Sequence, residues 1–168
     1  ILLTFFACEK ANLEFNPTSN LSNGTLGLIQ TFGGSKNDVA QSVIATLDGG
    51  FAVIGYTQSM DGDVSDKLNE SFDFWVLKFN SEANLEWNKT FGGSGDDRGF
   101  DIIQTSDNGF AILGYTDSSD GDITINNGFR DFWLAKLDAS GNLTWQKSFG
   151  FSGADEGIAI IETSDNDF

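Results

Sequence analysis

The chain has 168 residues, of which 9 are Lys or Arg and 25 are Asp or Glu, so its formal net charge is −16. A chain this acidic lacks the basic surface with which proteins bind nucleic-acid phosphates or anionic lipid headgroups, and we expect no nucleic-acid partner. The sequence contains no His and one Cys, which excludes the commonest general base, the commonest transition-metal ligand and an intrachain disulfide.

The N-terminal residues ILLTFFAC are apolar apart from Thr4 and end at the single cysteine, Cys8. A transmembrane helix needs roughly 20 apolar residues, so this segment is too short to span a bilayer. It resembles the end of a bacterial lipoprotein signal peptide, which is cleaved before a Cys that then carries lipid, and Ala7 suits the position before the cut. The alternative is a buried strand with a core cysteine.

The polar residues 9–24 include the single Pro and are predicted to form a flexible tether between the anchor and the folded domain. Together with the lipoprotein resemblance, this tether implies a protein of the bacterial cell envelope, either an outer-membrane lipoprotein or a cell-surface protein. The lipid on Cys8 would be its only attachment to the membrane.

The remainder of the chain repeats itself. TFGGSKND at 31–38 returns as TFGGSGDD at 90–97 and as SFGFSGAD at 148–155, so the copies begin 59 and 58 residues apart. Likewise, LDGGFAVIGYT at 47–57 matches SDNGFAILGYT at 106–116. Because the similarity extends over the whole unit, each unit is predicted to fold in the same way.

Each unit is predicted to contain four strands, since short aromatic and β-branched runs alternate with turn signals such as Asp-Gly and Asn-Gly. A long polar loop separates the second strand from the third. In the first unit the strands are expected near 39–46, 51–57, 73–79 and 85–91, with the loop at 58–71. The second unit, 98–149, repeats this order, a third is expected near 156–168, and 25–31 aligns with a lone fourth strand.

Four strands in a unit of about 58 residues predict an all-β fold, a β-propeller with four-stranded antiparallel blades. The alternatives are a β-helix, whose turns are usually shorter, and an array of β-sandwiches, whose units are usually longer. A closed propeller needs at least about four blades. We therefore expect residues 25–168 to be an incomplete propeller, with two full blades and partial blades at both ends.

Three recurring patterns carry a family resemblance: D-G-G-F-x-x-x-G-Y-T-x-S-x-D-G-D, then D-F-W-x-x-K, then N-L-x-W-x-K-x-F-G-G-S. Over 25–168 they resemble the repeat of large secreted or lipid-anchored β-propeller proteins of Bacteroidetes-type bacteria. The segment LDASGNLTW at 137–145 is also similar to the tryptophan-docking motif of quinoprotein-type propellers, in which the Trp packs between neighbouring blades. The resemblance implies the fold and not a quinone cofactor.

The Asp-Gly-Asp loops are the candidate metal sites. Clustered carboxylates around a Gly are the oxygen ligands that Ca²⁺ prefers, although the EF-hand spacing is absent. The alternative is an Asp-rich turn whose carboxylates accept backbone N–H groups. The candidate ligands are Asp61, Asp63 and Asp66 in the first loop and Asp117, Asp120 and Asp122 in the second.

Aromatic residues that do not recur between units are the candidate carbohydrate contacts. Exposed rings at Phe72, Phe100, Phe129 or Phe151 would stack on a sugar, and the alternative is ordinary packing. No catalytic residue is predicted, because each candidate carboxylate recurs in every unit whereas an active site is normally unique. The repeated Asp-Phe-Trp at 73–75 is interpreted as scaffold for the same reason.

The hypothesis that follows is a cell-envelope-anchored propeller that works as a binding or scaffold protein. It would display the inter-strand loops 58–71 and 117–130 to a ligand such as a polysaccharide or an envelope or surface protein. The alternative is a fragment of a propeller enzyme, of the glycoside-processing or quinoprotein type, whose active site lies in other blades. A fold of this kind does not by itself decide between them.

Overall fold

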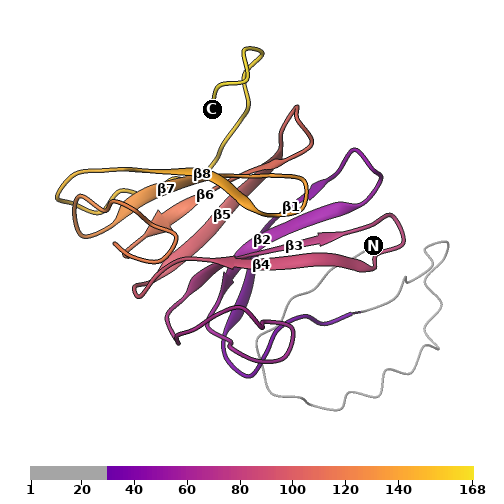
Figure 1. The fold of residues 1–168 in the computed structure, drawn as a ribbon, viewed down its shortest axis with the longest axis horizontal. Coiled ribbons are helices and arrows are strands. Elements are labelled where there is room, and N and C mark those ends of the chain that lie inside the picture. Colours follow the sequence, from indigo (N-terminus) through magenta and orange to yellow (C-terminus); the bar gives the residue numbers. More distant parts are fainter. Residues whose placement is uncertain (1–29) are drawn as a thin grey trace, which may run out of the picture.

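The computed structural model describes residues 30–168, which form two four-stranded antiparallel sheets and no helix (Figure 1). Within this described part, no helix has the length and hydropathy needed to span a bilayer. The expected lipid attachment at Cys8, the tether at 9–24 and all but the last two residues of the expected lone strand at 25–31 lie outside the described residues.

Both sheets are antiparallel meanders in which each strand pairs with the next one along the chain. The predicted four strands per unit are confirmed, and the first strand of each unit starts at the aspartate that ends the repeated Gly-Ser segment. The first sheet contains β1 (Asp38–Ala45), β2 (Phe51–Thr57), β3 (Asp73–Phe79) and β4 (Leu85–Phe91). The second contains β5 (Asp97–Gln104), β6 (Phe110–Thr116), β7 (Asp131–Leu137) and β8 (Leu143–Phe149).

The turn between β1 and β2 closes with a hydrogen bond from Thr46 N to Gly50 O at 3.0 Å, and Gly49 adopts a φ of 83°. The equivalent turn in the second unit places Asn108 at a φ of 66°. A third copy is formed at 163–167, where Asn166 has a φ of 62°. The expected third hairpin is present only as this turn.

The lysine of the Asp-Phe-Trp strand fixes this turn from the neighbouring strand. Lys78 Nζ lies 2.7 Å from a carboxylate oxygen of Asp48 and 2.8 Å from one of Glu86. The hydrogen bond from Lys78 holds the pKa of Asp48 well below its usual range. Lys136 repeats the contact with Asp107 at 2.9 Å. The repeated strand segment is therefore used as scaffold, as the sequence predicts.

Glycine in β2 and β6 allows the first two strands of each sheet to approach closely. A Cβ on Gly55 would lie 1.8 Å from the carbonyl oxygen of Val39, and one on Gly114 would lie 1.9 Å from that of Arg98. In both sheets the pairing register shifts next to this contact, which marks a β-bulge. The predicted close backbone approach at Gly55 is confirmed.

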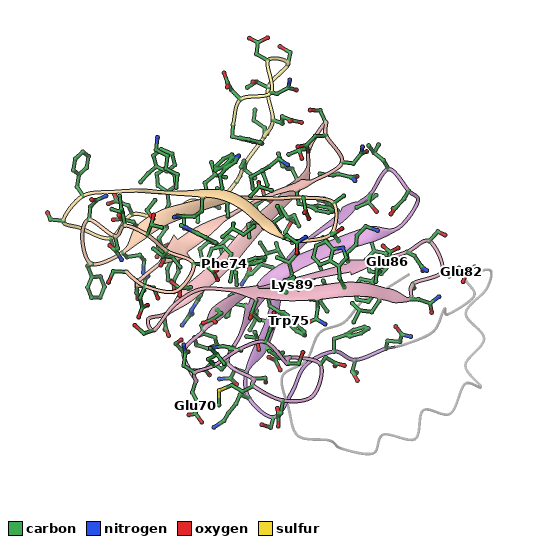
Figure 2. The ribbon with its side chains drawn as sticks, in the orientation of Figure 1. Glu70, Phe74, Trp75, Glu82, Glu86 and Lys89 are labelled. Atoms are coloured by element: carbon green, nitrogen blue, oxygen red, sulfur yellow. The ribbon has the colours of Figure 1, made fainter. Side chains whose placement is uncertain are left out.

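The two sheets pack face to face through the side chains that alternate along their strands. Phe74 points from β3 toward the second sheet and meets Trp133 of β7, with ring centroids 4.9 Å apart and planes at 70°. Trp75, the next residue in β3, faces the opposite side of the first sheet (Figure 2). The core between the sheets contains Ala52, Ile54, Phe74, Val76, Phe91, Ile102, Phe110, Ile112, Ile123, Trp133, Ala135 and Leu137.

Trp87 on β4 joins the edge of the first sheet to the second sheet. Its ring centroid lies 5.7 Å from that of Phe110, and a Cβ on Gly141 would lie 2.8 Å from the indole. Trp145, the Trp of the segment that resembles the tryptophan-docking motif, is 41% exposed, and that resemblance stays a prediction. The arrangement is consistent with propeller-like blades, while a closed ring stays a prediction.

Replacing Phe74 by Ala is expected to lower the free energy of unfolding by about 3–5 kcal/mol, because a large side chain is removed from the core between the sheets. Val43→Ala, at an exposed position of β1, should change it by no more than about 0.5 kcal/mol. Urea unfolding followed by tryptophan fluorescence measures both variants. Equal, small losses would contradict the face-to-face packing.

Candidate functional site

The long loops between the second and third strands, 58–72 and 117–130, lie at the same end of their sheets as the connections that lead into β1 and β5. We call this the loop end; in Figure 1 it points to the lower left, away from the tight turns. Both ends of each loop are set by antiparallel strand pairing, which pairs Thr57 with Asp73 and Thr116 with Asp131. The strands therefore hold the loop roots at the same spacing in both units.

A buried aspartate at the start of the first strand ties the loop root to the preceding connection. One carboxylate oxygen of Asp97 accepts a hydrogen bond from Thr116 Oγ1. The other accepts hydrogen bonds from Ser118 Oγ at 2.7 Å and from Gly93 N at 2.8 Å. The contacts of Asp38 in the first unit are the same, with Thr57, Ser59 and Gly34 as donors.

Asp97 and a second buried carboxyl, Asp73 at the start of β3, face the connecting glycine Gly92. A Cβ on Gly92 would lie 2.7 Å from an oxygen of Asp97 and 2.8 Å from the carboxyl carbon of Asp73. Burial raises the pKa of Asp97 to about 6, against the hydrogen bonds from Thr116, Ser118 and Gly93 that lower it. Burial also raises the pKa of Asp73 to about 6, although Lys67 opposes this.

Carboxyls with a pKa near 6 are the groups from which general acids and bases are made. Here the pair recurs: Asp131 and Asp155 face Gly150 in the next unit as Asp73 and Asp97 face Gly92. A pair that recurs at both of these connecting glycines is a structural feature of the repeat. No catalytic role is assigned to it.

The Asp-Gly-Asp carboxylates also bind the connections. Asp61 accepts a hydrogen bond from Ser35 N at 2.7 Å, which lowers its pKa, and Asp63 accepts one from Gly33 N at 2.9 Å. In the second unit Asp120 accepts from Ser94 N at 2.7 Å, and Asp122 from Gly92 N at 3.1 Å. Burial raises the pKa of Asp122.

The two remaining candidate ligands point elsewhere. Asp66 accepts hydrogen bonds from Thr90 N at 3.1 Å and Thr90 Oγ1 at 2.9 Å. Asp117 forms an ion pair with Arg130 Nε at 2.9 Å. Across residues 30–168, no group of three or more acidic, His or Cys side chains is placed to hold a metal ion. Calcium binding by these loops stays a prediction of the sequence, and the geometry adds nothing to it.

The four candidate aromatic platforms divide into packed and exposed rings. Phe72 packs edge-on against Tyr56 at 5.2 Å, with the guanidinium of Arg98 4.2 Å from its ring centroid. Phe100 packs edge-on against Tyr115 at 5.5 Å. These two rings are part of the scaffold.

Phe129 and Phe151 are exposed at the loop end, with 70% and 85% of their surface open to solvent. Their segments lie against each other, because a Cβ on Gly128 would lie 1.9 Å from the carbonyl oxygen of Phe151. Arg130 N donates to Gly153 O at 3.3 Å and strengthens this contact. Two exposed rings are thus carried on adjoining backbone segments.

A polar groove lies between the two long loops, with a volume of about 290 Å³. Acidic, amide and hydroxyl side chains face it, next to Leu68, whose side chain is 94% exposed. Its lining includes Asp66, Leu68, Asn69, Thr90, Ser94 and Asp120. Hydrogen-bonding groups beside an apolar side chain are suited to a neutral polar ligand.

Two features at the loop end were not predicted from the sequence. Arg130 lies with its guanidinium 3.8 Å from the ring centroid of Tyr115 and pairs with both Asp117 and Glu156. Lys67 is buried and reaches Asp73 at 3.1 Å. Arg130 and Lys67 have no counterpart in the other unit's loop, and this break in the repeat was the signal that could have marked them.

Comparison with known proteins assigns no function to this chain, so its function has to be argued from its own residues. No model of a known protein family matches the chain, and no curated protein matches it either.

The raised pKa of Asp97 predicts that stability increases as the pH falls from about 7 to about 5. A carboxyl with a pKa near 6 in the folded chain and about 3.9 in the unfolded chain binds its proton more tightly when folded. Its stabilising contribution is complete below the unfolded value and is lost as the pH rises through 6. The gain over this interval is about 1 kcal/mol per carboxyl.

Thermal unfolding at a series of pH values measures this effect. Asp97→Asn should reduce the pH dependence of Tm between these limits, whereas Asp165→Asn, at an exposed position, should leave it unchanged. A Tm of the unaltered chain that is flat from pH 7 to pH 5 would contradict the buried carboxyls.

Proposed function

We propose that the protein is a binding scaffold of the bacterial cell envelope that presents its loop end to a polysaccharide. The observation that carries this proposal is the contrast between the two units. Their strand registers and the aspartate contacts at their loop roots repeat, while the loops between those roots differ in length, charge and exposed side chains.

The repeated contacts hold the loops without contributing to specificity. The buried aspartates Asp38 and Asp97 fix the loop roots, and the Asp-Gly-Asp carboxylates fix the first turn of each loop. Beyond that turn the first loop exposes Leu68, whereas the second exposes Ile125 and Phe129. Variable loops on a rigid scaffold are the usual location of binding residues.

A neutral polysaccharide fits the chemistry of the loop end. Phe129 and Phe151 offer apolar rings on which a sugar face can stack. The separate groove between the two long loops contributes carboxylate, amide and hydroxyl groups. The net charge of −16 disfavours phosphorylated or strongly anionic ligands. An envelope or surface protein is the alternative ligand.

The location at the envelope rests on the lipoprotein-like segment that ends at Cys8, followed by the polar tether at 9–24. A lipid anchor with a flexible tether would let the loop end reach polymers outside the membrane. The tether and the exposed loops thus both support the binding of a ligand outside the membrane.

The double variant Phe129→Ala and Phe151→Ala is expected to weaken binding to a neutral polysaccharide about tenfold, because two stacking surfaces are removed. Affinity electrophoresis in gels that contain the polysaccharide, after a glycan-array screen has identified one, gives the measurement. Leu47→Ala is the matched control, since Leu47 is equally exposed but lies at the end with the tight turns.

Unchanged affinity of the double variant would rule out the two rings as the sugar platform. If no neutral glycan is retained and a surface protein binds through these rings instead, the polysaccharide is the wrong ligand for this end of the molecule.

A further inference from the structure

Asp131, the first residue of β7, is completely buried, with none of its surface exposed. Its Oδ2 accepts a hydrogen bond from Asn127 N at 2.8 Å and a longer one from Asn127 Nδ2 at 3.3 Å. Among the described residues, no donor lies within hydrogen-bonding distance of its Oδ1. A buried carboxylate oxygen without a hydrogen-bond partner lowers the stability of the fold, so we expect a bound ligand to satisfy Asp131 Oδ1.

The other unit shows what satisfies the equivalent oxygen. Asp73 is the first residue of β3, and Lys67 Nζ lies 3.1 Å from its Oδ1. The same ammonium group donates to Asn69 O at 2.7 Å and to Asn69 Oδ1 at 3.1 Å, and the lysine side chain is fully buried. A single positive charge therefore sits among oxygen atoms at this place in the first unit.

The two places correspond atom by atom. Asp73 Oδ1 is 3.0 Å from the point where a Cβ on Gly92 would stand, and Asp97 Oδ2 is 2.7 Å from it. At Gly150 in the second unit, the distances are 2.3 Å to Asp131 Oδ1 and 2.9 Å to Asp155 Oδ2. Each connecting glycine is faced by the same two carboxylates, and the Oδ1 that lacks a partner is the one that Lys67 binds in the first unit.

The second unit has no side chain to replace that lysine. Its loop, 117–130, contains no Lys, and Asn126 stands four residues after Asp122 as Lys67 stands four residues after Asp63. The one cationic residue in this loop, Arg130, is directed to Asp117 and Glu156. The sequence change from Lys to Asn thus removes the positive charge that the first unit places against this buried carboxylate.

We infer that a monovalent cation, Na⁺ or K⁺, binds at Asp131 and Asp155 in place of the lysine ammonium group. The charge required is that of the ammonium which the first unit uses. A divalent cation is less suited to this site, because Ca²⁺ takes about six to eight oxygen ligands. Among the described residues, no third acidic side chain lies with Asp131 and Asp155. Asp155 Oδ2 also accepts a hydrogen bond from Phe151 N at 3.0 Å, which positions it beside the ion.

The test compares the Tm of the chain in KCl or NaCl with its Tm in choline chloride, at an ionic strength of about 0.15 M. Because an ion that binds only the folded chain stabilises it, we expect Tm to be about 3 °C higher in the small-cation salts. Asp131→Asn should abolish this difference, since it removes the negative charge without removing the side-chain volume. No difference in the unaltered chain, or the same difference in Asp131→Asn, would overturn the inference and leave a water molecule as the partner of Oδ1.

A second variant and a direct measurement cover the case in which Asp131→Asn does not fold. Lys67→Met removes the ammonium group from Asp73 and should create a second site, so the Tm difference between KCl and choline chloride should grow. Crystals soaked in Tl⁺ should show an anomalous peak between Asp131 and Asp155 in the unaltered chain. An unchanged Tm difference in Lys67→Met, or no peak at that position, would contradict the proposed ion.

Discussion

The structure depends on the burial of a carboxylate at the start of each unit's first strand. Asp97 accepts hydrogen bonds from the second strand through Thr116, from the loop root through Ser118 and from the incoming connection through Gly93. Two segments about 20 residues apart, the connection at 93–97 and the loop root at 116–118, thereby meet at one side chain. Each donor compensates for the loss of water around a charge that would otherwise be too costly to bury.

This constraint explains why the sheets stack and why the loops can vary. With the connection fixed to the loop root, β5 must begin beside the first sheet, and the alternating side chains of both sheets then meet in the core around Phe74 and Trp133. Because these contacts already hold the loop roots, residues beyond the first loop turn are free to change. The exchange of Lys67 for Asn126 is one such change.

Much of this fold could be predicted from the sequence, because the two aligned units show the same pattern of strands and turns. Strand bounds followed from the aromatic runs, and turns from Asp-Gly and Asn-Gly, since both depend on local patterns. The partners of the Asp-Gly-Asp carboxylates could not be read in this way. Whether Asp61 meets a metal ion or the amide of Ser35 is decided by segments 26 residues apart, and no local pattern encodes their distance.

Whether an aromatic ring is packed or exposed also could not be predicted from the local sequence. Phe72 and Phe129 occupy similar positions before the third strand of each unit, yet one is packed against Tyr56 and Arg98 and the other faces solvent. Whether each ring is buried or exposed depends on which residues the packed sheets place next to it. A resemblance between repeats therefore predicts the buried scaffold well and the exposed surface of the loops poorly.

Native-state hydrogen exchange of backbone amides tests the central claim most directly, since it measures how firmly the buried aspartate holds the loop root. The amides of Gly93 and Ser94, which donate to Asp97 and Asp120, should exchange as slowly as those in the middle of β6, while the amide of the exposed Leu68 should exchange rapidly. If Gly93 and Ser94 exchange as fast as Leu68, the aspartate does not fix the loop root and the loops are not displayed on a rigid scaffold.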